Sequence, residues 1–98
     1  MMKRIYKVSQ SVNYGYDTYD SVIVVADNVD EASKLDPSGF HIWSEERECW
    51  MFVYSDGRME AERSHGSWCH PKDTTVELLG LTDLYNENKV ILASFNAG

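Results

Sequence analysis

Four residues have side chains of the types that bind zinc: Cys49, His65, Cys69 and His70. Thiolates and imidazoles are the usual ligands of tetrahedral zinc sites, which gather them as two close pairs. In this sequence Cys49 has no second ligand nearby, and Cys69 and His70 are adjacent, so that both cannot easily turn toward one ion. The spacing argues against a metal site, and we expect neither a metal nor another cofactor.

The same residues offer a thiol nucleophile, Cys69, with His65 or His70 as its base. Such a pair works only when a third group orients the imidazole in a shielded pocket, and residue types alone do not supply that geometry. The acidic run at residues 45–48 has the carboxylates that acid–base catalysis uses, but a charge run is more typical of a solvated loop. The six glycines lie singly, which excludes a glycine-rich phosphate loop. The sequence therefore favours a protein that is not an enzyme.

A binding role is indicated instead by the stretch SVNYGYDTYD at residues 11–20, which connects two expected strands. Tyrosine supplies a large contact area at low entropic cost, and aspartate accepts hydrogen bonds from arginine or lysine of a partner. The alternative is that the rings fold onto the sheet while Asn13 and Gly15 form turns. The residues predicted to bind a partner are Tyr14, Tyr16, Asp17, Tyr19 and Asp20.

Length and charge limit the kinds of partner. A chain of 98 residues supports one core, so residues 1–98 are expected to form a single domain. Its formal net charge of −7 repels nucleic acid phosphates and anionic lipids, so we expect a protein partner with a basic surface. The alternative is that the acidic residues only keep a small protein soluble.

The sequence also limits the compartment. It has no run near the ~18 apolar residues of a membrane span and no hydrophobic region of a secretory signal at its N-terminus. We therefore expect a cytoplasmic protein without membrane contact, either a monomer or a homodimer. In that compartment Cys49 and Cys69 are expected to remain free thiols.

The first half of the chain predicts two strands and a helix. Alternating apolar residues indicate a strand at residues 3–12, and a continuous apolar run indicates a strand at residues 21–26 with both faces covered. Asn28 is expected to cap a short helix, which the turn at residues 36–39 ends. The expected buried stripe of this helix is Val29, Ala32 and Leu35.

The second half predicts a hairpin and two more strands. Residues 40–48 show no clean period and are expected to be irregular. The Asp56–Gly57 pair predicts a tight turn between a strand that begins at Cys49 and a charged edge strand at residues 58–63. Trp68 is expected to anchor the following loop, and residues 74–79 and 89–95 to form the last strands.

Together these elements predict an α+β fold: a single small domain, mainly an antiparallel sheet of five or six strands, with one short helix packed on one face.

The order of four segments, VNYGYDTYDS, VIVVADNVDEA, WCHPKDTTVELLG and VILASFNAG, resembles a family of small phage- and prophage-encoded proteins of uncharacterised function. The resemblance covers nearly the whole chain, but it transfers no functional residue. It implies a viral origin and residence in a bacterial host cell, where such proteins often bind and block a host or defence protein. The alternatives are a structural protein that self-associates through strand edges such as residues 90–95, and a small zinc or thiol protein.

Overall fold

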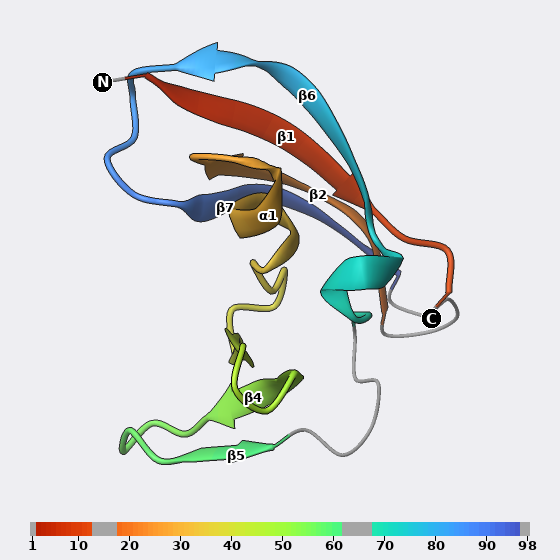
Figure 1. The fold of residues 1–98 in the computed structure, drawn as a ribbon, viewed down its shortest axis with the longest axis vertical. Coiled ribbons are helices and arrows are strands. Elements are labelled where there is room, and N and C mark those ends of the chain that lie inside the picture. Colours follow the sequence, from red (N-terminus) through yellow and green to blue (C-terminus); the bar gives the residue numbers. More distant parts are fainter. Residues whose placement is uncertain (1, 13–17, 62–67, 97–98) are drawn as a thin grey trace.

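The computed structural model of the 98-residue chain describes residues 2–12, 18–61 and 68–96. These residues form an α+β fold with two antiparallel sheets, one α-helix and one 3-10 helix (Figure 1). In chain order the elements are β1 (Lys3–Ser9), β2 (Thr18–Ala26), α1 (Val29–Ser33), β3 (His41–Ser44), β4 (Cys49–Val53), β5 (Met59–Ala61), η1 (Pro71–Asp73), β6 (Thr75–Thr82) and β7 (Lys89–Asn96). The mainly antiparallel α+β prediction is confirmed, but the expected single sheet of five or six strands is wrong, because the strands divide into two sheets.

The larger sheet has the strand order β6-β1-β2-β7 and carries the core on one face. Tyr6 pairs with Val24 and Val8 with Val22, so these four side chains lie on the same face of the sheet. All four are buried, and they form one cluster with Ala26, with Ala32 of α1 and with Trp68 and Cys69. Figure 1 shows α1 lying against this face.

The strand boundaries differ modestly from those expected. β1 ends at Ser9, three residues early, and Val12 beyond it is 59% exposed. β2 begins at Thr18, because its pairing with the last residues of β7 extends it into the expected loop. On the face opposite the core, Val25 is fully buried and Ile23 half-buried, in agreement with a strand covered on both sides.

The helix is capped as predicted but is shorter than its expected stripe. The side-chain oxygen of Asn28 accepts a hydrogen bond of 2.8 Å from the backbone N–H of Glu31. Because α1 ends at Ser33 after five residues, it makes a single turn and only Ala32 of the stripe lies fully buried on the sheet. Leu35 packs against the core from beyond the helix, and Val29 is 54% exposed, so its assignment to the buried stripe is wrong.

The smaller sheet has the strand order β3-β4-β5. The prediction that residues 40–48 are irregular is wrong, because His41–Ser44 form β3, in which Trp43 pairs with Trp50 of β4. A strand of four residues that is partly exposed on both faces has too few positions to show a period. The predicted tight turn is confirmed: Gly57 has a φ of +92°, and the backbone N–H of Gly57 donates a hydrogen bond of 3.0 Å to the oxygen of Tyr54. The strand that follows, β5, lies at the edge of its sheet, as expected.

Three further predictions concern Trp68, the length of β6 and the two cysteines. Trp68 is only 3% exposed, which confirms it as the anchor of its loop. β6 continues to Thr82, three residues beyond the predicted end, and both Cys49 and Cys69 are free thiols, as expected. Within the described ranges, none of the helices has the length and apolar character needed to cross a membrane.

Candidate functional site: a groove between the two sheets

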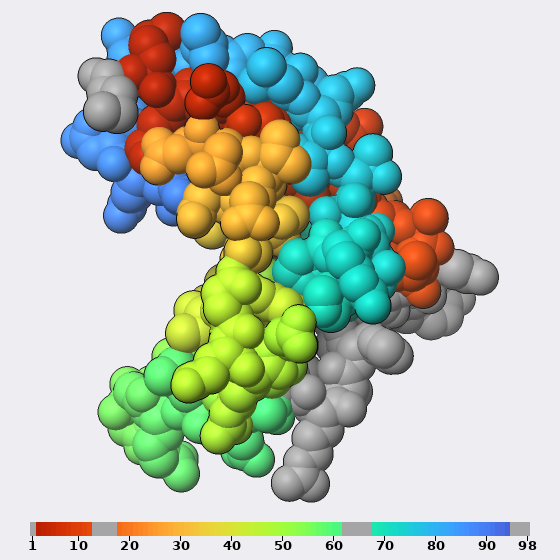
Figure 2. Space-filling view, viewed as in Figure 1, coloured from red at the N-terminus to blue at the C-terminus, as the bar shows by residue number. Residues whose placement is uncertain are grey.

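A groove with a volume of about 560 Å³ separates the two sheets. Its walls come from α1, from the turn that follows α1, from β3 and from Val90 of β7. Figure 2 shows the molecule hollowed between the part formed by α1 with the larger sheet and the part formed by the smaller sheet. The groove is therefore open to solvent and accessible to a partner.

Asp36 organises the turn that borders the groove. Its carboxylate, 2% exposed, accepts hydrogen bonds from the Oγ of Ser38 at 2.5 Å and from the backbone N–H of His41 at 3.0 Å. The Nδ1 of His41 lies 3.0 Å from the same carboxylate oxygen. A carboxylate only accepts hydrogen bonds, so this contact requires the proton of the ring on Nδ1. Asp36 thus fixes the turn and the orientation of the His41 ring together.

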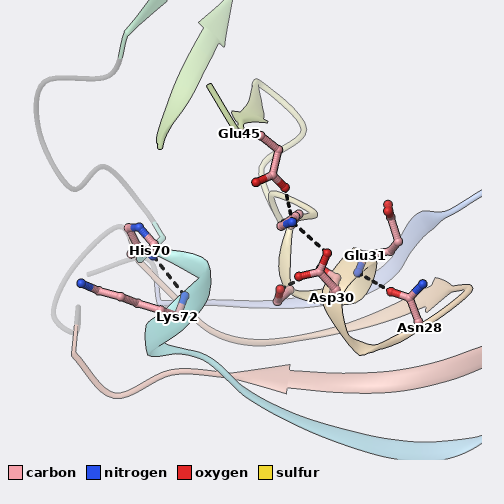
Figure 3. A network of polar contacts seen from close by, with 8 residues as sticks. Asn28, Asp30, Glu31, Glu45, His70 and Lys72 are labelled. Atoms are coloured by element: carbon pink, nitrogen blue, oxygen red, sulfur yellow. Dashed lines mark hydrogen bonds and ion pairs between the residues drawn. The ribbon is translucent and has the colours of Figure 1, made fainter. Parts of the chain in front are cut away.

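Lys34 connects the helix to the smaller sheet at the rim of the groove. Its ammonium group lies 2.8 Å from Asp30 of α1 and is also paired with Glu45, which follows β3. Figure 3 shows Asp30 and Glu45 approaching this group from either side. The hydrogen bonds to the two carboxylates raise the pKa of Lys34, so its charge is retained at neutral pH and is already balanced by its neighbours.

Contacts between aromatic rings lie where the smaller sheet meets the segment that precedes β6. The rings of Trp43 and Trp50 meet edge to face with centroids 5.3 Å apart, and Trp43 meets the ring of His70 at 4.7 Å. The indole N–H of Trp50 donates a hydrogen bond of 2.8 Å to the backbone oxygen of Cys69. These contacts join the smaller sheet to the segment that precedes β6.

The charges that line the groove are mainly negative. The exposed carboxylates of Glu31 and Glu45 line it together with the buried Asp36, against Lys34 and the imidazole of His41. Lys34 is paired with Asp30 and Glu45, whereas among the described residues the exposed Glu31 makes no ion pair with it. Ile42, 49% exposed, and Leu35 add apolar surface beside these acids. The groove thus combines carboxylates with apolar and aromatic surface.

The pair of Asp36 and His41 raises the question of catalysis. An aspartate that orients a histidine is also part of general-base triads. Here, however, the carboxylate accepts a backbone N–H and a serine hydroxyl of its own turn, which is how aspartate stabilises turns. The hydroxyl of Ser38 is directed to Asp36 and not toward a base that would activate it. The arrangement therefore favours a structural role.

The structure places only part of the predicted tyrosine site. Tyr14, Tyr16 and Asp17 lie outside the described residues. Tyr19 and Asp20 lie in β2 and not in the expected loop. The side chain of Tyr19 is half-buried against the core, whereas Asp20 is exposed and accepts a hydrogen bond of 3.4 Å from the hydroxyl of Ser94. Neither Tyr19 nor Asp20 lines the groove.

The zinc and thiol candidates have other partners in the structure. His65 lies outside the described residues. The Nδ1 of His70 accepts a hydrogen bond of 3.1 Å from the backbone N–H of Lys72, so His70 caps η1 (Figure 3). Cys49 has its sulfur 3.8 Å from that of Met51. Among residues 2–12, 18–61 and 68–96, no three acidic, histidine or cysteine side chains come together to hold a metal ion.

Burial decides the chemistry of the second cysteine. Cys69 is 4% exposed, and its burial, together with the nearby charge of Asp73, raises the pKa of the thiol to about 11. The thiolate is the reactive form, so Cys69 is a poor nucleophile at neutral pH. The acidic run also has a simple role, since Glu45 is held by Lys34 and Glu48 adopts a φ of +51° in the turn between β3 and β4.

The sequence did not predict the groove, because its lining residues come from several elements and were assigned to the end of the helix or to an irregular segment. Asp36 belongs to the turn that was expected to end the helix, and Trp43 to the segment that was expected to be irregular. The available signal was an aspartate in a turn, shortly before Ser38 and His41, since aspartate side chains accept hydrogen bonds from backbone N–H groups of their own turn.

Neither protein-family models, nor curated proteins, nor solved structures give a match to this chain. The resemblance to phage-encoded proteins therefore stays a prediction from the sequence.

Proposed function

We propose that the protein is a non-enzymatic binding module that holds a basic segment of a protein partner in the groove between its two sheets. The observation that carries this proposal is the lining of the groove, in which the exposed carboxylates of Glu31 and Glu45 lie beside apolar and aromatic surface. Carboxylates attract lysine and arginine, and their long aliphatic stems pack well on apolar side chains.

The charge of the whole chain supports the same kind of partner. A net charge of −7 accelerates the approach of basic proteins and repels nucleic acids. The resemblance to small phage proteins suggests that the partner is a bacterial protein, such as a component of a defence system. In this proposal Tyr14 and Tyr16, which lie outside the described residues, provide a second contact.

Binding to the groove is tested with two charge reversals that change the net charge equally. Glu31 lines the groove, whereas Glu46 is exposed in the turn after β3 and does not line it. Partners captured from bacterial lysate on the wild-type protein are identified by mass spectrometry, purified, and titrated against Glu31→Lys and Glu46→Lys. We expect Glu31→Lys to weaken binding about tenfold, equivalent to about 1.4 kcal/mol, and Glu46→Lys to have a much smaller effect.

Equal loss of affinity in both variants would leave only a non-specific attraction to charge, and unchanged affinity in both would remove the groove from the proposal. The tyrosine contact is tested separately by the double variant Tyr14→Ala/Tyr16→Ala. Tyr19 is kept in this variant because its ring packs against the core. If the double variant binds every partner as the wild type does, residues 13–17 have no part in recognition.

A further inference from the structure

A second surface of the protein has the properties of a binding site: the outer edge of β6. This strand is terminal in its sheet, and in the part of the chain that the structure describes no strand pairs with its outer side. Its leucines are unusually exposed for a strand, at 56% for Leu78, 51% for Leu79 and 56% for Leu81. In Figure 2 the residues of β6 lie on the upper rim of the molecule, away from the groove.

Proteins normally protect such edges, because a row of unpaired N–H and C=O groups pairs readily with other strands. The smaller sheet follows this rule: β5 has three residues, including Glu60, and follows Arg58. β6 has eight residues and a single charged side chain, Glu77. A bulge at Leu79 increases the local twist but leaves residues 75–78 regularly paired with β1. Among the described residues the edge of β6 is therefore left unpaired and without the protection that β5 has.

The other edge of the larger sheet is less suited to the same role. β7 exposes Leu92 at 67%, but Ile91 only at 37%. It also begins with Lys89, whose ammonium group lies over the ring of Tyr85, and lysine is the residue that most often discourages strand pairing.

Charge decides what kind of strand fits β6. From residue 73 to residue 83 the chain has three acids, Asp73, Glu77 and Asp83, and no lysine or arginine. If a second copy paired antiparallel along the whole strand, two-fold symmetry would bring Asp73 of each copy close to Asp83 of the other, at both ends of the ladder. Like charges so placed oppose self-association. A partner strand with basic residues near its ends meets opposite charges instead.

We propose that the outer edge of β6 accepts an extended segment of a basic protein as a fifth strand of the larger sheet. In such strand addition the main chain supplies hydrogen bonds, and alternate side chains supply specificity. Apolar residues of the segment cover the exposed leucines, and lysine or arginine at its ends pairs with Asp73 and Asp83. This surface is separate from the groove, and the inference does not depend on the groove being a binding site.

The test uses a library of random twelve-residue peptides selected on the wild-type protein. The enriched peptides are then titrated against two leucine-to-lysine variants in exposed edge strands, Leu79→Lys in β6 and Leu92→Lys in β7. We expect enrichment of sequences that alternate apolar residues and end in lysine or arginine. Their affinity is expected to fall at least tenfold in Leu79→Lys and to change less than threefold in Leu92→Lys.

A second measurement on the unmodified protein guards against a variant that fails to fold. When a selected peptide binds wild type, hydrogen exchange of backbone amides in residues 75–82 is expected to slow, since new interstrand hydrogen bonds form there. The proposal is overturned if no peptide is enriched, if protection appears along β7 or β3 instead, or if Leu79→Lys binds the peptides as tightly as wild type. Dimerisation of the free protein through β6 would assign the edge to a second copy. A loss of binding in Glu31→Lys alone concerns the groove and leaves this inference unaffected.

Discussion

The indole Nε1 of Trp50 donates a hydrogen bond of 2.8 Å to the backbone oxygen of Cys69. Trp50 lies in β4 of the smaller sheet, and Cys69 belongs to the core cluster of the larger sheet. In the described part of the chain the two sheets share no strand pairing, so side-chain contacts of this kind hold them in place. Trp43, which lines the groove, pairs with Trp50, so this contact lies next to the groove wall.

Replacing Trp50 by phenylalanine tests this connection. The variant loses the hydrogen bond and leaves the oxygen of Cys69 without its donor, so the free energy of unfolding is expected to fall by about 2 kcal/mol in urea titrations. Tyr54→Phe is the control, since it removes a hydrogen bond of 2.6 Å to Glu60 at an exposed position. The control is expected to change stability by less than about 0.5 kcal/mol. Equal effects of the two substitutions would contradict the role assigned to Trp50.

Among the carboxylates that line the groove, replacement of Asp36 is expected to lower the free energy of unfolding most. In Asp36→Ala the hydroxyl of Ser38 and the backbone N–H of His41 lose their acceptor in a buried turn, so stability is expected to fall by about 2–4 kcal/mol. Asp27→Ala is a matched substitution that removes an exposed ion pair with Lys3, for which we expect less than about 1 kcal/mol. Thermal and urea unfolding of the two variants measure the difference. A small loss in Asp36→Ala would show that the turn does not depend on this carboxylate.

The hairpin turn between β4 and β5 is expected to require glycine at position 57. Gly80, which lies in β6, serves as a control because a side chain is expected to be tolerated there. Gly57 has a φ of +92°, which side chains with a Cβ rarely adopt, so Gly57→Ala is expected to cost about 1–2 kcal/mol. Gly80 lies in ordinary strand conformation with nothing within 4 Å of an added Cβ, so Gly80→Ala is expected to be neutral. Chemical denaturation of both variants decides the point, and equal stabilities would contradict the strain argument.

Stability is expected to decline at alkaline pH because of Cys69. Burial raises the pKa of its thiol from an ordinary value of 9.0 to about 11. As the pH rises through 9, the unfolded chain loses this proton while the native chain keeps it, so the free energy of unfolding falls until about pH 11. The slope is at most about 1.4 kcal/mol per pH unit. Comparison with Cys69→Ala isolates this contribution, since the difference in stability between wild type and variant should shrink over that range.

The same pKa predicts the reactivity of the thiol. At pH 8 the native protein is expected to incorporate iodoacetamide at Cys69 far more slowly than the urea-unfolded protein, because little thiolate is present and the side chain is buried. Peptide mapping by mass spectrometry separates Cys69 from Cys49. Rapid modification of native Cys69 at pH 8 would restore the thiol-enzyme hypothesis.

The sequence identified the elements whose signals are local. The capping oxygen of Asn28 and the positive φ of Gly57 both depend on residues a few positions apart, so their patterns can be read directly. The burial of Trp68 was also predictable, because it is the one large apolar residue of a turn-rich loop and its ring gains stability when it packs against the core. The order of strands was not predictable, because pairing of β1 with β6 joins residues about 70 positions apart.

The candidate sites depended on distant contacts and were therefore missed or only partly found. The sequence predicted a tyrosine site, and of its described members Tyr19 turned toward the core once β2 paired with β7. The acidic character of the surface, the free thiols and the hairpin follow from composition and from neighbouring residues alone. The division into two sheets, the groove between them and the open edge of β6 arise only when segments far apart pack together, because burial and strand pairing are properties of the whole chain.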